Sequence, residues 1–320
     1  MGLKKLDEAA FIALHDCMAV KKDENVLVLT DDQTLPIGQA LFDAGKTLAR
    51  EILLAIMPVR KVNGEEPPAE IAELMTRYQV VICPSQKSLT HTAARRNACK
   101  AGARVGTMPG ITEEMMIRTM QADYHTIAER TKKLTAILDQ TALVKVTTSL
   151  GTDIILPVEG IKAISSTGLL LEKGAFGNLP SGESYMMPEE GKSTGIIVVD
   201  GSFAGIGKIT DQPIRLIVEK GFVVKIEGGT EAKKLEEMLK PLAPKSYTIA
   251  ELGIGTNDQA RICGNILEDE KVMGTVHIAL GNNMSMGGSC DVAIHVDGII
   301  MHPSVWVDGA LLLDNGKLLI

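Results

Sequence analysis

Apolar and polar residues follow two different patterns along the chain, and the change falls near residue 125. Before it, short apolar runs alternate with segments whose apolar residues recur every three or four positions, which predict strands and helices respectively. The expected strands cover residues 25–32, 52–59, 80–85 and 103–108. The expected helices cover residues 6–18, 35–50, 71–78 and 90–101, with another beginning at 112. Strands alternating with helices predict a parallel sheet covered on both faces.

The second part of the chain has the pattern of an antiparallel β domain. Residues 125–141 predict a polar helix that links the two parts. Beyond it, strand-like segments are separated by Asp-Gly, Lys-Gly and Asn-Gly pairs, which favour hairpin turns. One helix, after Thr230, interrupts them. We therefore predict two domains: an α/β, Rossmann-like domain over residues 1–125 and a β-rich, metal-binding catalytic domain over 126–320.

Two histidines and three acids in the second part form the candidate site. His295 and Asp297 lie two positions apart in a strand-like segment, so their side chains point to the same face. His277 lies in another such segment, Glu251 closes an apolar run, and Glu183 lies in a Pro/Gly turn. Imidazole and carboxylate ligands suit zinc, manganese, cobalt or ferrous iron. The five residues together indicate a metalloenzyme, whereas H-x-D alone is not a specific motif.

Two metal-dependent chemistries are compatible with this set. Two ions about 3.5–4 Å apart need four or more ligands, including a bridging carboxylate, and suit peptide hydrolysis. A single ion facing two histidines and one carboxylate would instead match the facial triad of ferrous oxygenases. The residues alone leave both open.

Composition excludes several other classes of protein. The chain has 320 residues, 45% hydrophobic content and a net charge of −7 without a basic block, so nucleic acid is not an expected partner. Neither a signal peptide nor an apolar run long enough for a membrane span is evident, so we expect a cytoplasmic protein without a membrane partner. The five cysteines are scattered, which favours reduced thiols. The first strand is not followed by G-x-G-x-x-G, so no dinucleotide site is expected there.

The candidate segments also resemble those of a known family. NLPSGESY, AELGIGTN, GTVHIALGNN and AIHVDGIIM are similar in order and spacing to the metal-binding segments of the thermophilic leucyl aminopeptidase family, of aminopeptidase T and S type. The resemblance extends to HTAARRNACKAGARVGTMPGIT in the first part of the chain. It implies that two divalent ions (zinc, cobalt or manganese) bind to a set of five residues: Glu183, Glu251, His277, His295 and Asp297. It further implies a short peptide substrate, proton transfer by Glu183 or Glu251, and a homodimer.

The chain departs from that family at one position that bears on catalysis. Where the family has a tyrosine seven residues after the histidine of HIALG, this chain has Met284, which cannot donate a hydrogen bond. Tyr185 is the nearest alternative donor in the sequence. The chain is also shorter than the typical peptidase of this family.

The segments also resemble the 2,5-dihydroxypyridine dioxygenases, which use Fe(II). These are similar around His295 and Asp297 but place a histidine where this chain has Glu251. The glutamate favours the peptidase interpretation, with the dioxygenase and a non-catalytic metal-binding homologue as alternatives. Elsewhere, the acidic run Glu268, Asp269 and Glu270 predicts a solvated turn, with a patch that recognises an amine as the alternative.

Overall fold

The computed structural model describes residues 2–320, which form two compact units. The first unit comprises the chain up to Ala128 together with the segment Thr167–Ser181. The second unit comprises Glu129–Ser166 and Gly182–Ile320. The domain boundary predicted between residues 125 and 126 stays a prediction. The two units divide between Ala128 and Glu129, and the chain returns to the first unit for the segment Thr167–Ser181.

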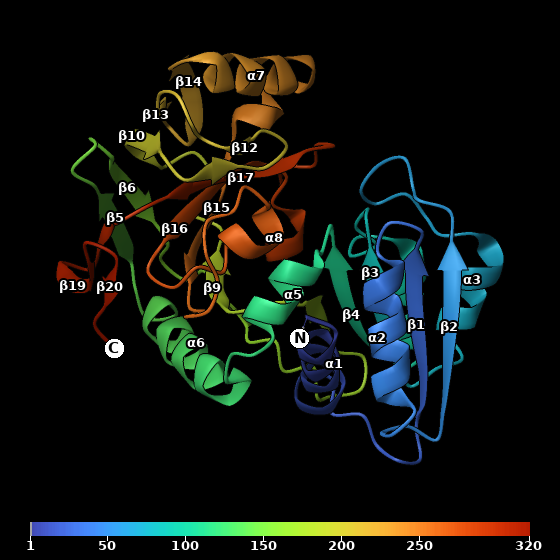
Figure 1. The fold of residues 1–320 in the computed structure, drawn as a ribbon. Helices are drawn as coiled ribbons and strands as arrows, with labels where there is room; N and C mark the ends of the chain where they lie inside the picture. Colours follow the sequence, from blue (N-terminus) through green and yellow to red (C-terminus); the bar gives the residue numbers. More distant parts are fainter. Residues whose placement is uncertain (1) are drawn as a thin grey trace. The chain divides into compact units, whose positions relative to one another are not determined.

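The first unit is built on a five-stranded parallel sheet (Figure 1). Its strands, in spatial order, are β2 (Glu51–Met57), β1 (Asn25–Asp31), β3 (Val80–Ser85), β4 (Arg104–Pro109) and β8 (Phe176–Asn178). The middle strands β1 and β3 are almost entirely buried, as expected for strands covered on both sides.

The helices of the first unit follow the predicted apolar spacing. They are α1 (Gly2–Ile12), α2 (Leu35–Gly45), α3 (Ala69–Met75), α4 (Ala93–Lys100) and α5 (Glu113–Thr119), with a π-helical turn η1 (Ala13–Cys17) after α1. Thr92 and Thr112 begin α4 and α5 as caps, each accepting a hydrogen bond from a backbone N–H three residues later. Leu27 and Leu29 of β1 pack with Met75 and Ala98 of α3 and α4 in one apolar core.

The second unit contains two antiparallel sheets. The eight-stranded sheet has the order β14 (Phe222–Glu227), β13 (Ile214–Glu219), β10 (Thr194–Val199), β6 (Asp153–Pro157), β5 (Leu143–Thr147), β18 (Ser304–Val307), β19 (Ala310–Asp314) and β20 (Lys317–Leu318). The seven-stranded sheet has the order β12 (Gly207–Lys208), β11 (Ser202–Phe203), β17 (His295–Ile300), β16 (Val276–Gly281), β15 (Ile249–Gly255), β9 (Glu183–Met186) and β7 (Ile164–Ser166).

A single apolar core joins the two sheets and two helices of this unit. It contains Val146 and Ile154 from the larger sheet and Leu252 and Ile278 from the smaller one. The two helices are α6 (Tyr124–Leu138) and α7 (Thr230–Leu239). The short helix α8 (Ile266–Asp269) and the 3₁₀ turns η2 (Lys240–Leu242), η3 (Lys245–Tyr247) and η4 (Met284–Met286) also belong to this unit. The predicted fold class, a parallel sheet with helices followed by antiparallel sheets, is confirmed. Across residues 2–320, no helix combines the length and apolarity that a membrane crossing requires.

Candidate metal centre

The five candidate residues lie on one face of the seven-stranded sheet. The opposite face supplies Leu252, Ile278 and other residues of the apolar core. Because side chains alternate along a strand, Glu251, His277 and Asp297 point away from that core. The strand register adds the remaining two residues to the same face. Glu183 pairs with Gly255 of β15, and His295 pairs with Gly281 of β16.

Small residues between the candidate ligands leave room for their long side chains. Gly253 lies directly opposite His277, and a Cβ atom at Gly253 would lie 1.9 Å from Nε2 of that imidazole. Ala279 lies opposite both Glu251 and Asp297. This interleaving of glycine and alanine lets the imidazoles and carboxylates lean over the sheet and meet.

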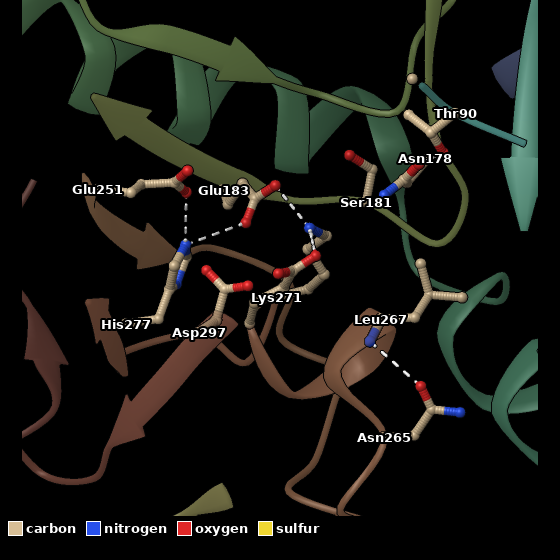
Figure 2. Close-up of polar contacts among 12 residues, drawn as sticks. Thr90, Asn178, Ser181, Glu183, Glu251, Asn265, Leu267, Lys271, His277 and Asp297 are labelled. Carbon is tan, nitrogen blue, oxygen red and sulfur yellow. Dashed lines mark hydrogen bonds and ion pairs between the residues drawn. The ribbon is translucent and has the colours of Figure 1, made fainter. Parts of the chain in front are cut away.

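The side chains converge within contact distance, and Figure 2 shows Glu183, Glu251, His277 and Asp297 of the five. Nε2 of His277 lies 3.3 Å from Oε1 of Glu251 and 3.5 Å from Oε2 of Glu183. Nε2 of His295 lies 3.3 Å from Oε2 of Glu251 and 3.5 Å from Oδ1 of Asp297. Glu251 therefore lies between the two imidazoles, with one oxygen facing each. His277 is fully buried, whereas a third of the His295 side chain is exposed.

Acidic side chains dominate the electrostatics of the cluster. Burial by itself lowers the pKa of His277, but the carboxylates of Glu251 and Glu183 raise it to about 9. Burial likewise opposes protonation of His295, yet Asp297 and Glu251 raise its pKa well above the ordinary value. Burial raises the pKa of Glu251, but hydrogen bonds with the two histidines lower it to about 2. The raised pKa values of the two histidines have one cause, the buried negative charge of the neighbouring carboxylates, which favours a cation among these side chains.

The donor atoms fit a divalent ion. Oε2 of Glu183 and Oδ1 of Asp297 are buried without a hydrogen-bond partner in the described part of the chain, a costly condition that a bound cation would relieve. Nδ1 of His295 lies 2.7 Å from the backbone oxygen of Asn282 and donates to it, which leaves the Nε2 lone pair free for an ion.

The potential ligand atoms fall into two sets of three. Within each set, the atoms lie within 4.8 Å of one another. The first group is Glu183, Glu270 and His277, and the second group is Glu251, His295 and Asp297. The five residues predicted from the sequence thus divide between the groups, and Glu270 joins them.

Glu270 and Lys271 were not predicted to belong to the site. Nζ of Lys271 lies 2.5 Å from Oε1 of Glu183 (Figure 2). The same ammonium also pairs with the carboxylate of Glu270. The Lys271 side chain is 1% exposed. Burial raises the pKa of Glu270 to about 8, although the Lys271 ammonium acts in the opposite direction. In the sequence, Glu270 and Lys271 are two charged residues shortly before a strand, and nothing in that pattern indicates that they are buried.

The prediction of a solvated turn for the acidic run is wrong, because Glu268 and Asp269 are fully buried. Asp269 accepts hydrogen bonds from the Ser202 hydroxyl at 2.5 Å and from the backbone N–H groups of Cys263 and Gly264 at 2.7 and 2.9 Å. The acidic run is thus a buried support that holds the chain beside Lys271. Burial became possible because backbone and hydroxyl donors satisfy these carboxylates.

The two residues linked to the missing family tyrosine occupy different surroundings. Met284 is 51% exposed, in the turn η4. Tyr185 pairs with Gly253 in the strand register and therefore shares the face of Glu183. Burial, followed by the charges of Glu183 and Glu251, raises the pKa of the Tyr185 phenol, so it stays a protonated donor.

Fold and site together define a class: an α/β unit followed by an antiparallel β unit that carries a carboxylate–histidine cluster suited to divalent ions. Residues 8–320 match the sequence model of the family described as NicX, 2,5-dihydroxypyridine 5,6-dioxygenase. The chain belongs to this family.

Individual relatives include members of both groups that the sequence resembles. The 2,5-dihydroxypyridine 5,6-dioxygenase of Pseudomonas putida is 25% identical over 239 residues, which span 69% of this chain and 65% of that protein. A solved structure of the Pseudomonas putida dioxygenase has a TM-score of 0.84 at 19% identity, covering 98% of this chain and 96% of its own. AmpT from Thermus thermophilus has a TM-score of 0.73 at 15% identity, covering 99% of both chains. Both structural relationships predicted from the sequence are confirmed.

Proposed function

We propose that the protein is a metal-dependent aminopeptidase that removes N-terminal residues from short peptides. The observation that carries this proposal is the position of Glu251, whose two oxygens each lie 3.3 Å from a different imidazole. A carboxylate between two sets of ligands is the arrangement of a bridging group in hydrolytic metal centres. The abundance of carboxylates also suits zinc, manganese or cobalt.

The residues of the chain have distinct tasks in this reaction. A bound divalent ion would lower the pKa of a water molecule and polarise the scissile carbonyl. Glu183 has a buried oxygen without a hydrogen-bond partner and is placed to take the proton of the attacking water and pass it to the leaving amine. Tyr185 lies on the same face and can donate a hydrogen bond to the developing oxyanion in place of the tyrosine that Met284 replaces.

Amino-acid arylamides test the proposal directly. With Co²⁺, Zn²⁺ or Mn²⁺ supplied, we expect hydrolysis of an arylamide that has a free α-amine, and loss of most of the rate when that amine is acetylated. A neutral amine can bind to a metal ion, whereas an acetamide nitrogen cannot. Equal rates on the free and acetylated compounds would contradict aminopeptidase chemistry.

A ring-cleaving dioxygenase is the second candidate, because the chain belongs to the family with that description. In that case one Fe(II) would be held by histidines and a carboxylate of the same cluster. Oxygen consumption with Fe(II) and 2,5-dihydroxypyridine, together with loss of the ring absorbance, would support it. The absence of arylamide hydrolysis with every ion in the same preparation would make it the preferred function. The short peptide substrate, a homodimeric assembly and a cytoplasmic location stay predictions.

A further inference from the structure

The two groups of ligand atoms differ in one respect: the first already contains a cation. Nζ of Lys271 contacts Glu183 at 2.5 Å and also contacts Glu270, so it pairs with both carboxylates of that group. Within residues 2–320, the ion-pair partners of Glu251 and Asp297 in the second group are imidazoles alone. The ammonium therefore offsets one of the two negative charges of the first group, whereas the second group has no ammonium of this kind.

Backbone hydrogen bonds of the N–H and the carbonyl group of Lys271 hold this residue in position. It follows α8, whose first turn is capped by Asn265. Its backbone N–H donates to the carbonyl of Glu268 at 2.9 Å, and its own carbonyl accepts from the N–H of Asn257 at 2.9 Å. Buried Asp269 anchors the preceding loop through Ser202. Because the backbone is fixed and the side chain is buried, the ammonium cannot leave for solvent without opening this part of the fold.

The charges of the groups then differ. With both imidazoles neutral, as ligation of a metal requires, two carboxylates and one ammonium give the first group one net negative charge at most, whereas the two carboxylates of the second group have two. The attraction of a divalent ion scales with this charge, and like charges repel strongly in a buried site.

We propose that Lys271 is the resident cation of the first group and makes the two halves of the centre unequal. The first divalent ion binds at Glu251, His295 and Asp297, and a second ion at Glu183, Glu270 and His277 binds much more weakly because it must displace or face the ammonium. This inference rests on the proposed metal-dependent function. It predicts that the side of Glu251 facing His295 fills first and that the second ion joins only at higher ion concentrations.

Titration of the metal-free full-length protein with Zn²⁺ or Mn²⁺, followed by calorimetry and by metal analysis after gel filtration, tests the inference without any assay of activity. Wild-type protein is expected to retain one ion per chain, with any second ion bound at least tenfold more weakly. Lys271→Met should bind the second ion at least tenfold more tightly than wild type. Lys271→Arg keeps the charge and should retain the wild-type behaviour. Lys192→Met, which removes an exposed lysine, is the matched control.

Ligand variants assign the ion to a group. His295→Ala should remove the tight ion, whereas His277→Ala should retain it. Two ions bound with similar affinity by wild type, or a tight ion lost only in His277→Ala, would overturn the inference. If Lys271→Met fails to fold, the wild-type isotherm and the two histidine variants still decide the matter. A folded wild-type protein that binds no ion refutes both this inference and the proposed function, whereas one tight ion without arylamide hydrolysis refutes the reaction alone.

Discussion

Buried acids in the two units differ in how completely their oxygens are hydrogen-bonded. Asp31 of the first unit is fully buried at the carboxyl end of β1. It accepts hydrogen bonds from the backbone N–H groups of Gln33 at 3.1 Å, Thr34 at 3.2 Å and Gln86 at 2.6 Å, and from the Thr34 hydroxyl at 3.1 Å. In the second unit, Glu183 and Asp297 each keep a buried oxygen without a hydrogen-bond partner.

The difference separates a structural acid from a functional one. The crevice between the carboxyl ends of β1 and β3 is where α/β folds commonly bind ligands, because the strand order reverses there. Here Asp31 fills that position with hydrogen bonds to its own chain. Burial of a carboxylate is therefore no evidence of a binding site by itself. A group of several buried carboxylates in which some oxygens have no hydrogen-bond partner is a stronger indication, because a bound cation would stabilise it.

The largest expected effect follows from removing a ligand of the unsatisfied cluster. His295→Ala should weaken binding of the tight ion by more than the roughly 10–100-fold that loss of an outer-sphere partner costs. Hydrolysis or oxygenation should be lost with it, while circular dichroism stays that of wild type. Calorimetry with Zn²⁺ measures the affinity. His125→Ala, at an exposed histidine of α6, is the control and should change neither quantity. Full affinity in His295→Ala would remove this residue from the site.

Removal of Asp31, whose oxygens are fully hydrogen-bonded, should lower the stability of the protein and leave ion binding unchanged. Asp31→Ala leaves four donors without their acceptor and should lower the free energy of unfolding by about 3 kcal/mol. Ion affinity should not change, because Asp31 belongs to the first unit. Urea denaturation and metal titration measure the two effects. Asp32→Ala, at the exposed neighbour, should cost little. A large loss of ion binding in Asp31→Ala would break the distinction between the two kinds of acid.

The space beside His277 provides a smaller test. In Gly253→Ala, the new methyl group would lie 1.9 Å from Nε2, so the imidazole must move. We expect a loss of about 1–3 kcal/mol in the free energy of unfolding, the usual cost of overpacking, together with reduced activity. The double variant Gly253→Ala, His277→Ala removes the clash. If the cost of the methyl group persists in that background, the ring is not the reason for glycine at this position.

The parts of this site that could be predicted from the sequence are those governed by strand periodicity. His295 and Asp297 share a face because they lie two residues apart in a strand, and His277 and Glu251 were found from histidine and glutamate in apolar runs. The family resemblance supplied the link to Glu183. The fold class followed in the same way from the change between helical and strand spacing.

Lys271 and Glu270 could not be found this way. Their burial depends on Ser202, which is far from the acidic run in the sequence, and on the backbone N–H groups of Cys263 and Gly264 in the preceding loop; together these satisfy Asp269 and fix the loop. A run of four charged residues normally lies in solvent, so local pattern favours the wrong answer. The return of the segment Thr167–Ser181 to the first unit is equally a property of tertiary packing.

The smallest expected effect concerns Glu24, a partly buried acid that is paired with a cation of its own chain, as Glu183 is with Lys271. In the first unit, Glu24 receives hydrogen bonds at 2.9 and 2.7 Å from the two terminal nitrogens of Arg104, whose side chain is 4% exposed. Burial acts to raise the pKa of Glu24, but the hydrogen bonds with Arg104 outweigh it and lower the pKa below the ordinary 4.5. The resulting stabilisation is present above pH 4.5 and is lost as the pH falls through the lowered value.

Glu24→Gln should therefore lower the free energy of unfolding by about 1–2 kcal/mol at neutral pH, since it replaces charge-assisted hydrogen bonds with neutral ones. The difference from wild type should shrink as the pH falls below 4.5, where the unfolded carboxyl is protonated. Urea denaturation at several pH values measures it. Glu73→Gln is the matched control, because the Glu73–Arg77 pair is exposed and should contribute little at any pH. A penalty for Glu24→Gln that is constant or grows in acid would show that the pair contributes through packing and not through charge. Of the two buried cations Arg104 and Lys271, only Lys271 would then have a position that charge explains.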